Sequence, residues 1–457
     1  MKKTLLEIAQ LVSGTLNDVL FGETEITGVC FDTRQLEDGD LFIPFVGETR
    51  DGHSFVRGAV DGGAAASFWQ ADIPNPPSDI PLVIVENSAL AFETFAAKYL
   101  AEVAPKVIAI TGSNGKTTTK DITRAIIGSR YKVHATSGNF NNHIGLPYTI
   151  LSMPDDTEVA ILEMGMNHRH EIEKLTRIAE PDLAIITNIG EAHIEYLGSR
   201  EEIAKAKLEI TLGLKQDGIL IYPQDEVLIE RHLPNGVKTE TFGKTGDADI
   251  YPLEIHTEIE GTRFISSLDP DTELVVPIIG EHNVYNTMAA LLAARELGID
   301  VKMAATALTG MERSKNRLEW LKAPRGTRIL NDSYNSSPTA LKAVLNTFMH
   351  MDAKGQKKVA VVADMLELGS DSERYHRESG AVLEARSIDE VFAYGEAMHA
   401  FVEAAAAKIG AEHVHYFKTK DELETALLNN LTGNEWVLFK GSYGMGLKDV
   451  VEKLMIG

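Results

Sequence analysis

The chain has 457 residues, which at roughly 100 to 200 residues per domain predicts two to four domains, each able to bury a core. Hydrophobic residues make up 44% and charged residues 24%, a composition that excludes a disordered or fibrous chain. The net charge of −23 repels nucleic-acid phosphates and anionic lipids, so we expect no nucleic-acid partner and no membrane insertion.

The first residues, MKKTLLEIAQLVSG, predict an amphipathic helix of the folded protein rather than a secretory signal. Glu7 and Gln10 interrupt the apolar run, while Leu5 and Ile8 fit one face of a helix. The single Cys30 cannot form an internal disulfide, and no apolar stretch approaches the roughly 18 residues that span a bilayer. We therefore expect a cytoplasmic protein.

Three stretches of the chain differ in pattern and predict a three-domain α/β protein. Residues 1–87 carry short apolar runs between Gly, Asp and Pro clusters, which indicate a small α/β domain. Residues 88–317 alternate β-rich runs with helical periods, which is typical of βαβ units and a mainly parallel sheet. Within them, residues 240–280 predict a hairpin-rich insertion. Residues 318–457 start the alternation again and predict a separate, doubly wound Rossmann-like domain.

The apolar runs in the central and last stretches predict the following strands, given in chain order. In the central stretch they are 106–111, 131–136, 158–164, 182–188 and 218–223, with helices at 117–127 and 200–212. In the last stretch they are 328–332, 357–364, 390–395, 413–418 and 435–440.

The segment KVIAITGSNGKTTTKD indicates a phosphate-binding loop between a strand and a helix. Gly112 and Gly115 allow backbone N–H groups to curl around phosphate oxygens, and the helix N-terminus adds partial positive charge. Lys116 can reach the β- and γ-phosphates, and the Thr117 hydroxyl can bind Mg²⁺. Two residues rather than the usual four separate the glycines, so a structural glycine turn is the alternative.

Two residues after neighbouring strands are candidate metal ligands. Glu163 ends the strand EVAILEM, and His193 lies just beyond the next strand, at the edge where parallel strands deliver side chains to a phosphate loop. The alternatives are a solvated carboxylate at a strand end and a structural histidine.

Helix phase separates two nearby lysines in REEIAKAKLEITL. At about 100° per residue, Lys207 falls on the apolar stripe between Ile203 and Ile210, whereas Lys205 points roughly 200° away from Ile203, toward water. A buried ammonium is unfavourable unless it is paired or chemically altered. Lys207 is therefore favoured as a functional residue over a side chain that reaches out to solvent.

Together these residues resemble the Mur ligases, ATP-dependent amide-forming enzymes of peptidoglycan precursor synthesis, over essentially the whole chain. The resemblance implies two Mg²⁺ ions with Thr117, Glu163, His193 and Lys207 as ligands, the last as a carbamate formed with CO₂. It also implies catalytic roles for Lys116, Lys207, His193 and Arg317. The implied ATP contacts are Thr111, Gly112, Ser113, Asn114, Gly115, Lys116, Thr117, Thr118, Asn283, Asn286, Arg317 and Asp332.

Other segments resemble the branch of the family that joins D-alanyl-D-alanine to UDP-N-acetylmuramoyl-tripeptide. They are GNFNNHIGLP at 138–147 and DSYNSSP at 332–338, and the N-terminal segment FDTRQLEDGDLFIPFVGETRDGHSFV resembles the uridine-nucleotide-binding domain of the family. The substrate contacts that they imply are Asp32, Thr33, Arg34, Asn139, Asn142, His143, Tyr334 and Asn335. An ordinary surface turn is the alternative for the first three.

The sequence departs from the family at KGSYGMGLKDVV. Tyr443 stands where an arginine is usual and Lys448 near a usual glutamate, so the contacts to the dipeptide carboxylate are not assigned. We expect a monomer. The alternatives are a folylpolyglutamate-type ligase, against which residues 1–87 argue, a nucleotide-driven switch or motor, and a non-catalytic nucleotide-binding module.

Overall fold

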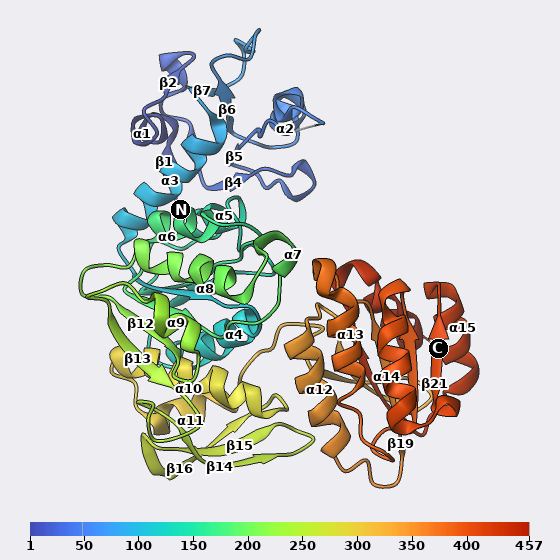
Figure 1. The fold of residues 1–457 in the computed structure, drawn as a ribbon. Coiled ribbons are helices and arrows are strands. Elements are labelled where there is room, and N and C mark those ends of the chain that lie inside the picture. Colours follow the sequence, from blue (N-terminus) through green and yellow to red (C-terminus); the bar gives the residue numbers. More distant parts are fainter. Residues whose placement is uncertain (48, 457) are drawn as a thin grey trace.

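The computed structural model describes residues 1–47 and 49–456. The chain forms three successive parts, each built around its own β-sheet, and the N-terminal part sits on the central part, away from the C-terminal part (Figure 1). The expected α/β fold with mainly parallel sheets is confirmed. None of the helices in these described ranges is both long and apolar enough to cross a bilayer.

The N-terminal part holds a five-stranded sheet, in which only β2 runs antiparallel to its neighbour, and a two-stranded pair. In α1 (Leu5–Leu11), the Thr4 hydroxyl accepts a hydrogen bond from Glu7 N at the helix start, and Leu5 and Ile8 are fully buried, as the helical spacing predicts. The sheet order is β2 (Thr15–Leu16), β7 (Leu82–Val85), β6 (Ala66–Gln70), β5 (Asp40–Phe42) and β4 (Gly28–Cys30). The other elements are β1 (Lys3–Thr4), β3 (Glu25–Ile26) and α2 (Val56–Asp61).

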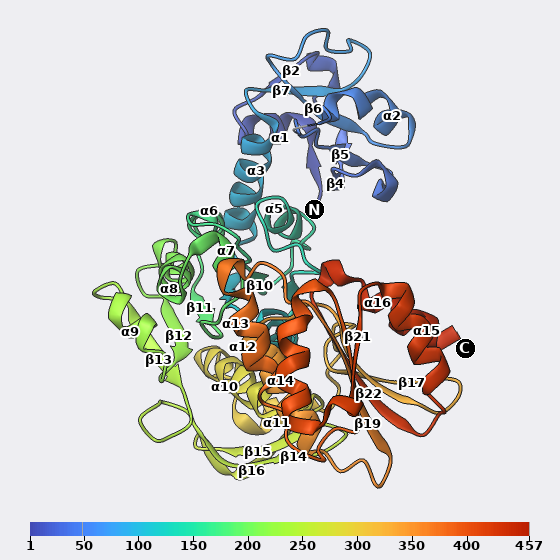
Figure 2. The same ribbon diagram turned by 45° about the vertical axis from the view of Figure 1, so that its right-hand side comes forward.

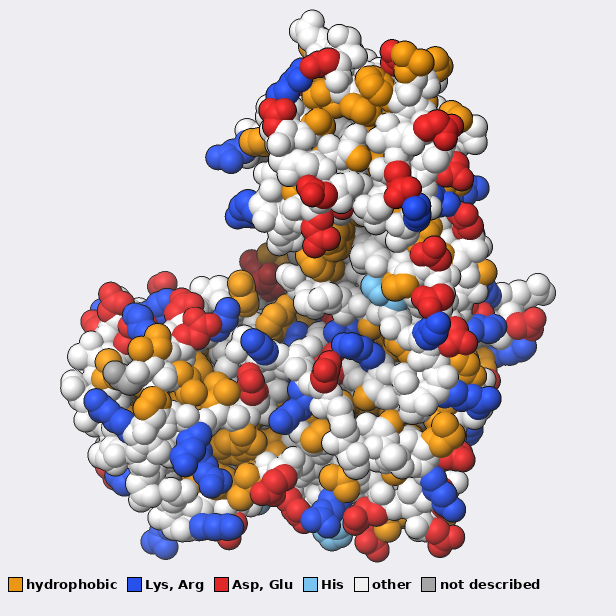
Figure 3. Space-filling model, turned by 180° about the vertical axis from the view of Figure 1, so that it is seen from behind, with side chains coloured by type: hydrophobic (Ala, Val, Ile, Leu, Met, Phe, Trp, Pro, Cys, Tyr) orange, Lys and Arg blue, Asp and Glu red, His pale blue; other side chains and the backbone are white. Residues whose placement is uncertain are grey.

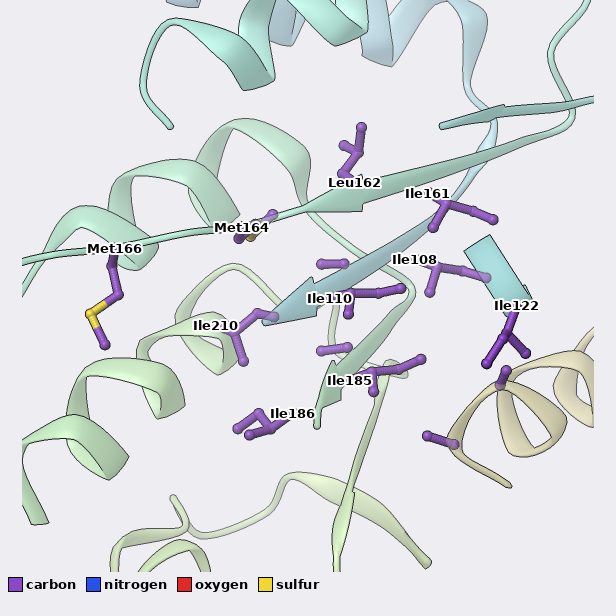
Figure 4. Close-up of a cluster of buried hydrophobic side chains, with 14 of the residues drawn as sticks. Ile108, Ile110, Ile122, Ile161, Leu162, Met164, Met166, Ile185, Ile186 and Ile210 are labelled. Atoms are coloured by element: carbon purple, nitrogen blue, oxygen red, sulfur yellow. The ribbon is translucent and has the colours of Figure 1, made fainter. Parts of the chain in front are cut away.

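The central part contains a six-stranded, all-parallel sheet. Its middle strands are buried on both faces, and Ile108, Ile161 and Ile185 lie in the apolar cluster of Figure 4. The strand order is β13 (Lys238–Phe242), β12 (Ile219–Pro223), β11 (Leu183–Ile186), β8 (Lys106–Thr111), β10 (Val159–Glu163) and β9 (Val133–Ala135).

Helices cover this sheet, and α10 packs against α4. The helix expected at 200–212 ends at Leu208 and continues as a 3₁₀ helix, Glu209–Leu212. The helices are α3 (Ser88–Val103), α4 (Lys116–Ile127), α5 (Gly145–Leu151), α6 (Glu171–Ala179), α7 (Ile194–Leu197), α8 (Arg200–Leu208), α9 (Val227–His232), α10 (Glu281–Glu296) and α11 (Val301–Leu308). The hairpin-rich insertion is confirmed as the antiparallel sheet β14 (Pro252–Thr257), β15 (Thr262–Ser266) and β16 (Asp269–Val276).

The C-terminal part is a doubly wound sheet with one antiparallel edge strand, β17. Its strand order is β17 (Glu319–Lys322), β18 (Arg328–Asp332), β22 (Glu435–Lys440), β19 (Lys357–Ala363), β20 (Glu390–Tyr394) and β21 (Val414–Phe417). One face is covered by α12 (Pro338–His350), α13 (Ser372–Gly380) and α14 (His399–Ile409), and the other by α15 (Lys420–Asn430) and α16 (Leu447–Ile456) (Figure 2).

The order of the central strands places the candidate site. The strand β8 lies between β10 and β11, so the strand order reverses direction at this point of the sheet. At such a point the loops that follow neighbouring strands run to opposite faces of the sheet, which opens a crevice beyond the carboxyl ends of the strands. The register pairs Glu163 with Ile110 and Ile186 with Thr111, so the three strands end close together.

On the surface seen in Figure 3, acidic and basic side chains are interspersed.

Candidate active site

The phosphate loop joins β8 to α4 through two glycines that no other residue would replace without strain. Gly115 precedes α4 with a φ of +79°, and a Cβ there would lie 2.8 Å from Asn286 Oδ1. A Cβ at Gly112 would lie 1.8 Å from Thr187 Oγ1. Lys116 Nζ donates a hydrogen bond of 2.8 Å to the Gly112 carbonyl. The lysine therefore lies folded over its own loop, with its ammonium held against the Gly112 carbonyl.

The segment after β11 braces this loop. Asn114 N donates to Asn188 Oδ1 at 3.0 Å, and the Thr187 hydroxyl donates to the Asn114 carbonyl at 2.5 Å. Gly190 N donates to Ser113 Oγ at 2.9 Å. Asn114 Nδ2 is buried and has no hydrogen-bond partner among the described residues, so a donor is left over at the loop.

A cavity of about 630 Å³ opens over the loop, with walls from both the central and the C-terminal parts. The predicted site residues that line it are Ser113, Asn114, Gly115, Lys116, Thr117, Thr118, Asn139, Glu163, His193, Asn283, Asn286, Arg317, Asp332, Tyr334 and Asn335. The predicted residues outside its lining are Asp32, Thr33, Arg34, Thr111, Gly112, Asn142, His143 and Lys207.

Oxygen ligands gather beside Lys116 in this cavity. The Thr117 hydroxyl donates to Glu163 Oε2 at 2.8 Å, and Asn141 Nδ2 donates to Glu163 Oε1 at the same distance. Glu163 is only 2% exposed, which distinguishes it from the solvated carboxylate considered above. Within residues 1–47 and 49–456, no cluster of three or more His, Cys, Asp and Glu side chains could hold a metal ion alone. A hydroxyl and a carboxylate suit Mg²⁺, which usually takes further ligands from substrate phosphates and water.

His193 immediately precedes α7 and has a left-handed backbone conformation, with a φ of +64°. Its Nδ1 lies 2.6 Å from Glu367 Oε2 of the C-terminal part. Burial, with further contributions from the charges of Lys116 and Lys207, lowers the pKa of His193 to about 3. The imidazole is therefore neutral at physiological pH, the form in which histidine binds metals.

Lys207 points inward from α8, as the helix phase predicts. It is 2% exposed, and its Nζ has no hydrogen bond or ion pair among the described residues. Burial, followed by repulsion from Lys116, lowers the pKa of Lys207 well below its usual value. Lys205, by contrast, pairs with Glu202 at 2.7 Å in a part-exposed position. Lys207 is thus an amine inclined to be neutral, with no salt bridge to stabilise its charge.

Asn283 and Asn286 lie on one face of α10, as their spacing predicts. Asn286 Nδ2 donates to Asn283 Oδ1 at 3.0 Å, and Asn283 Nδ2 donates to the Ile279 carbonyl at 2.8 Å. Both line the cavity, so this hydrogen-bonded pair connects a cavity wall to Gly115 of the phosphate loop.

Arg317, at the junction of the central and C-terminal parts, lines the cavity together with an ion pair and an aromatic ring of the C-terminal part. The Arg317 guanidinium carbon lies 4.0 Å from the centre of the Tyr334 ring, a cation–π geometry. Asp332 pairs with Lys440 at 2.6 Å, and Lys440 Nζ also donates to the Asn335 carbonyl at 2.7 Å. The positions of Asp332 and Asn335 are therefore coupled through one buried lysine.

The predicted uridine-nucleotide contacts form a local turn in the N-terminal part. Asp32 begins a 3₁₀ helix at Thr33, and its carboxylate accepts hydrogen bonds from Arg34, including one of 2.6 Å. The side-chain bonds from Arg34 lower the pKa of Asp32 to about 2. Arg34 is strongly exposed. Asp32, Thr33 and Arg34 therefore form a surface turn, the alternative considered from the sequence, and the Arg34 guanidinium is exposed to solvent.

The loop at 138–147 divides between the cavity and local structure. Asn142 Oδ1 accepts a hydrogen bond of 2.8 Å from Gly145 N and organises the start of α5, and His143 is exposed. Asn141, which the sequence prediction passed over between Asn139 and Asn142, is the amide that contacts Glu163. The sequence predicted substrate contacts within the segment 138–147. It could not identify Asn141, because a loop has no periodicity that indicates which of its asparagines points inward.

Two other cavity residues, His282 and Lys440, were also missed, and both stand inside segments that resemble family motifs. Tyr443, the departure from the family, is 68% exposed, and its ring centre lies 6.0 Å from that of Tyr334.

Comparisons with known proteins define the class of this fold and site. The sequence model of the Mur ligase middle domain matches residues 110–294, and that of the Mur ligase glutamate ligase domain matches residues 316–443. The UDP-N-acetylmuramoyl-tripeptide--D-alanyl-D-alanine ligase of Bacillus subtilis (strain 168) is 45% identical over 456 residues, covering 100% of this chain and 99% of the relative. The chain belongs to the Mur ligase family.

Solved structures agree with this assignment. MurF from Acinetobacter baumannii superposes with a TM-score of 0.88 at 29% identity, covering 100% of this chain and 99% of that one. The MurF ligase from Thermotoga maritima in complex with ADP gives a TM-score of 0.80 at 27% identity, covering 94% and 97%.

Proposed function

We infer that this protein is an ATP-dependent ligase that joins D-alanyl-D-alanine to UDP-N-acetylmuramoyl-tripeptide, forming the pentapeptide precursor of peptidoglycan and releasing ADP and phosphate. The likeness to the Bacillus subtilis ligase over the whole chain supports this reaction. The observation that carries it is the cavity in which the phosphate loop of the central part faces Arg317, Asp332 and Tyr334. One wall thus binds the triphosphate while the other closes over it.

The reaction proceeds in two steps. A tripeptide carboxylate oxygen attacks the γ-phosphorus of ATP, the bond to the β-phosphate oxygen breaks, and ADP leaves behind an acyl phosphate. The amine of D-alanyl-D-alanine then attacks the acyl carbon, loses a proton, and expels phosphate as the amide forms. Lys116 and Arg317 act as cations beside the transferring phosphoryl group, so catalysis depends on positioning and electrostatics.

The residues present fit two Mg²⁺ ions, with Thr117, Glu163, His193 and a carbamate on Lys207 as protein ligands. When bound, the ions would neutralise charge on the phosphate oxygens. A largely neutral Lys207 amine supports the carbamate, because its nitrogen can add to the carbon of CO₂ with release of a proton. Asn114 Nδ2, buried without a partner among the described residues, supports an additional contact to a phosphate oxygen.

We assign uridine-nucleotide binding to residues 1–87 through Asp32, Thr33 and Arg34, ATP binding to residues 88–317, and closure to residues 318–457. The exposed Arg34 supports this assignment, because a guanidinium can pair with a phosphate bidentately. Asn139, Tyr334 and Asn335 are the remaining peptide contacts that the cavity supports. The unpaired Cys30 supports a cytoplasmic setting, and we propose that the protein acts as a monomer.

The decisive experiment measures phosphate release with ATP, Mg²⁺ and UDP-N-acetylmuramoyl-tripeptide, with D-alanyl-D-alanine present or withheld. Mass detection should find the pentapeptide only in the complete mixture. Equal ATP turnover without the dipeptide, and no pentapeptide, would instead support a nucleotide-driven switch or motor.

A further inference from the structure

Glu367 meets His193 across the boundary between the central and C-terminal parts. Its Oε2 lies 2.6 Å from His193 Nδ1, and its backbone carbonyl accepts a hydrogen bond of 3.1 Å from Glu195 N. The side chains of Glu367 and His193 are 38% and 21% exposed. The same two segments are thus joined by a side-chain pair and by a main-chain hydrogen bond.

Both residues are held in an unusual backbone conformation. His193 has a φ of +64° and Glu367 a φ of +62°, in the left-handed region that residues other than glycine seldom occupy. Gly369, two residues further on, also has a positive φ, and a Cβ there would lie 3.3 Å from Glu195 Cα. Such strain persists only where surrounding contacts hold it, and it tends to gather at functional sites.

The chemistry of the pair determines where the imidazole proton lies. An ionised carboxylate only accepts hydrogen bonds, so the short contact to Glu367 requires a proton on His193 Nδ1. In a neutral imidazole the other nitrogen, Nε2, then carries a lone pair. Metal-binding histidines are commonly arranged in this way, with a carboxylate on the nitrogen that faces away from the metal.

We propose that Glu367 is a positioning residue, which holds His193 in the tautomer whose Nε2 is free to bind a divalent cation. This inference rests on the proposed function, because it assigns a partner to one of its ligands. Since Glu367 lies in the C-terminal part and His193 in the central part, the correct tautomer forms only when the two parts are docked. Closure and cation binding are thereby coupled at a single hydrogen bond.

The first test reads the tautomer directly. Nitrogen-15 NMR of the full-length protein, with the His193 signals assigned by their loss in His193→Asn, should show the Nδ1-protonated tautomer. Glu367→Ala should shift this signal toward the Nε2-protonated or mixed state. Glu367→Gln should retain the wild-type signal, because its amide oxygen still accepts the proton. Glu195→Gln is the matched control: it removes a neighbouring exposed charge whose side chain forms no hydrogen bond or ion pair with His193 among the described residues, and the tautomer should not change.

The second test measures cation binding without turnover. Mn²⁺ is titrated in the presence of ADP and its binding is followed by electron paramagnetic resonance. The dissociation constant for Mn²⁺ should be roughly 10- to 100-fold higher in Glu367→Ala than in the wild type. Glu367→Gln and Glu195→Gln should stay close to the wild type.

An unchanged tautomer together with unchanged Mn²⁺ affinity in a folded Glu367→Ala protein would overturn the proposal. So would weaker Mn²⁺ binding with an unchanged tautomer, since the contact would then only dock the two parts. Neither readout requires ligase turnover, and so a failure here is distinct from the absence of pentapeptide synthesis by the wild type.

Discussion

Replacing Gly115 by alanine tests the close approach between the phosphate loop and α10. A side chain in the left-handed conformation costs about 1 to 2 kcal/mol. The new Cβ would lie 2.8 Å from Asn286 Oδ1, and Asn286 is buried and hydrogen-bonded to Asn283, so displacing it sacrifices about 0.5 to 1.5 kcal/mol more. The sum, roughly 1.5 to 3.5 kcal/mol, is smaller than the free energy of unfolding of a typical protein, and we expect Gly115→Ala to fold.

Gly355→Ala is the matched control for this prediction. Gly355 has the same φ of +79°, and a Cβ there would have no heavy atom within 4 Å, so only the backbone cost of about 1 to 2 kcal/mol applies. Urea unfolding should therefore separate the two variants by about 0.5 to 1.5 kcal/mol. If that difference is also lost from nucleotide binding, the dissociation constant for ATP should rise roughly 2- to 12-fold in Gly115→Ala alone.

A double-mutant cycle makes the test stricter. Adding Asn286→Ala removes the atom that the new Cβ would meet, so the two changes should be less than additive in the free energy of unfolding. Equal destabilisation by Gly115→Ala and Gly355→Ala, with unchanged ATP affinity, would refute the reasoning.

Four further predictions concern the lysine, the arginine and the movement of the parts. Lys207→Ala should lower turnover roughly 10²- to 10³-fold, and added short carboxylic acids should restore part of it; full activity without them would contradict the carbamate. In buffer without metal or bicarbonate, Lys207→Met should be more stable than the wild type at neutral pH. The folded-state pKa of Lys207 is lowered, so the wild type regains stability as pH rises toward the unfolded value of about 10.4, and urea unfolding should show the difference shrinking. Arg317→Lys keeps the charge but loses the planar contact with Tyr334, so the KM for ATP should rise about 2- to 5-fold in steady-state assays; no rise would mean that the contact is not used. Small-angle X-ray scattering should show a smaller radius of gyration with an ATP analogue and UDP-N-acetylmuramoyl-tripeptide, whereas an unchanged profile would argue against closure.

The parts of the fold that depend on local pattern could be predicted from sequence. The strand at 435–440 is reproduced at both ends, because a continuous apolar run between polar segments is the signature of a strand buried on both faces. The inward orientation of Lys207 likewise follows from helix phase alone, and its 2% exposure agrees.

Contacts between distant segments could not be predicted in this way. Glu367 and His193 are 174 residues apart, and their contact depends on how two sheets dock rather than on any local period. Asn141 presents a second kind of limit, because only the three-dimensional path of its loop distinguishes it from the asparagines on either side. The left-handed backbone conformation of Glu367 is a third feature that could not be predicted, because the neighbouring residues do not indicate a positive φ at a residue other than glycine.

The balance of charge in the cavity explains how an acidic protein can bind a polyanion. The net charge of −23 opposes nucleotide binding at long range, so the attraction must be local. The cationic side chains of the lining are Lys116, Lys244, Arg317 and Lys440, and its carboxylates are Glu163, Asp225 and Asp332. This excess of one positive charge is too small to balance a triphosphate, and a carbamate on Lys207 would add another negative charge nearby. The charge balance therefore favours divalent cations beside the triphosphate, and we expect turnover to depend on Mg²⁺ even where Lys116 and Arg317 are intact.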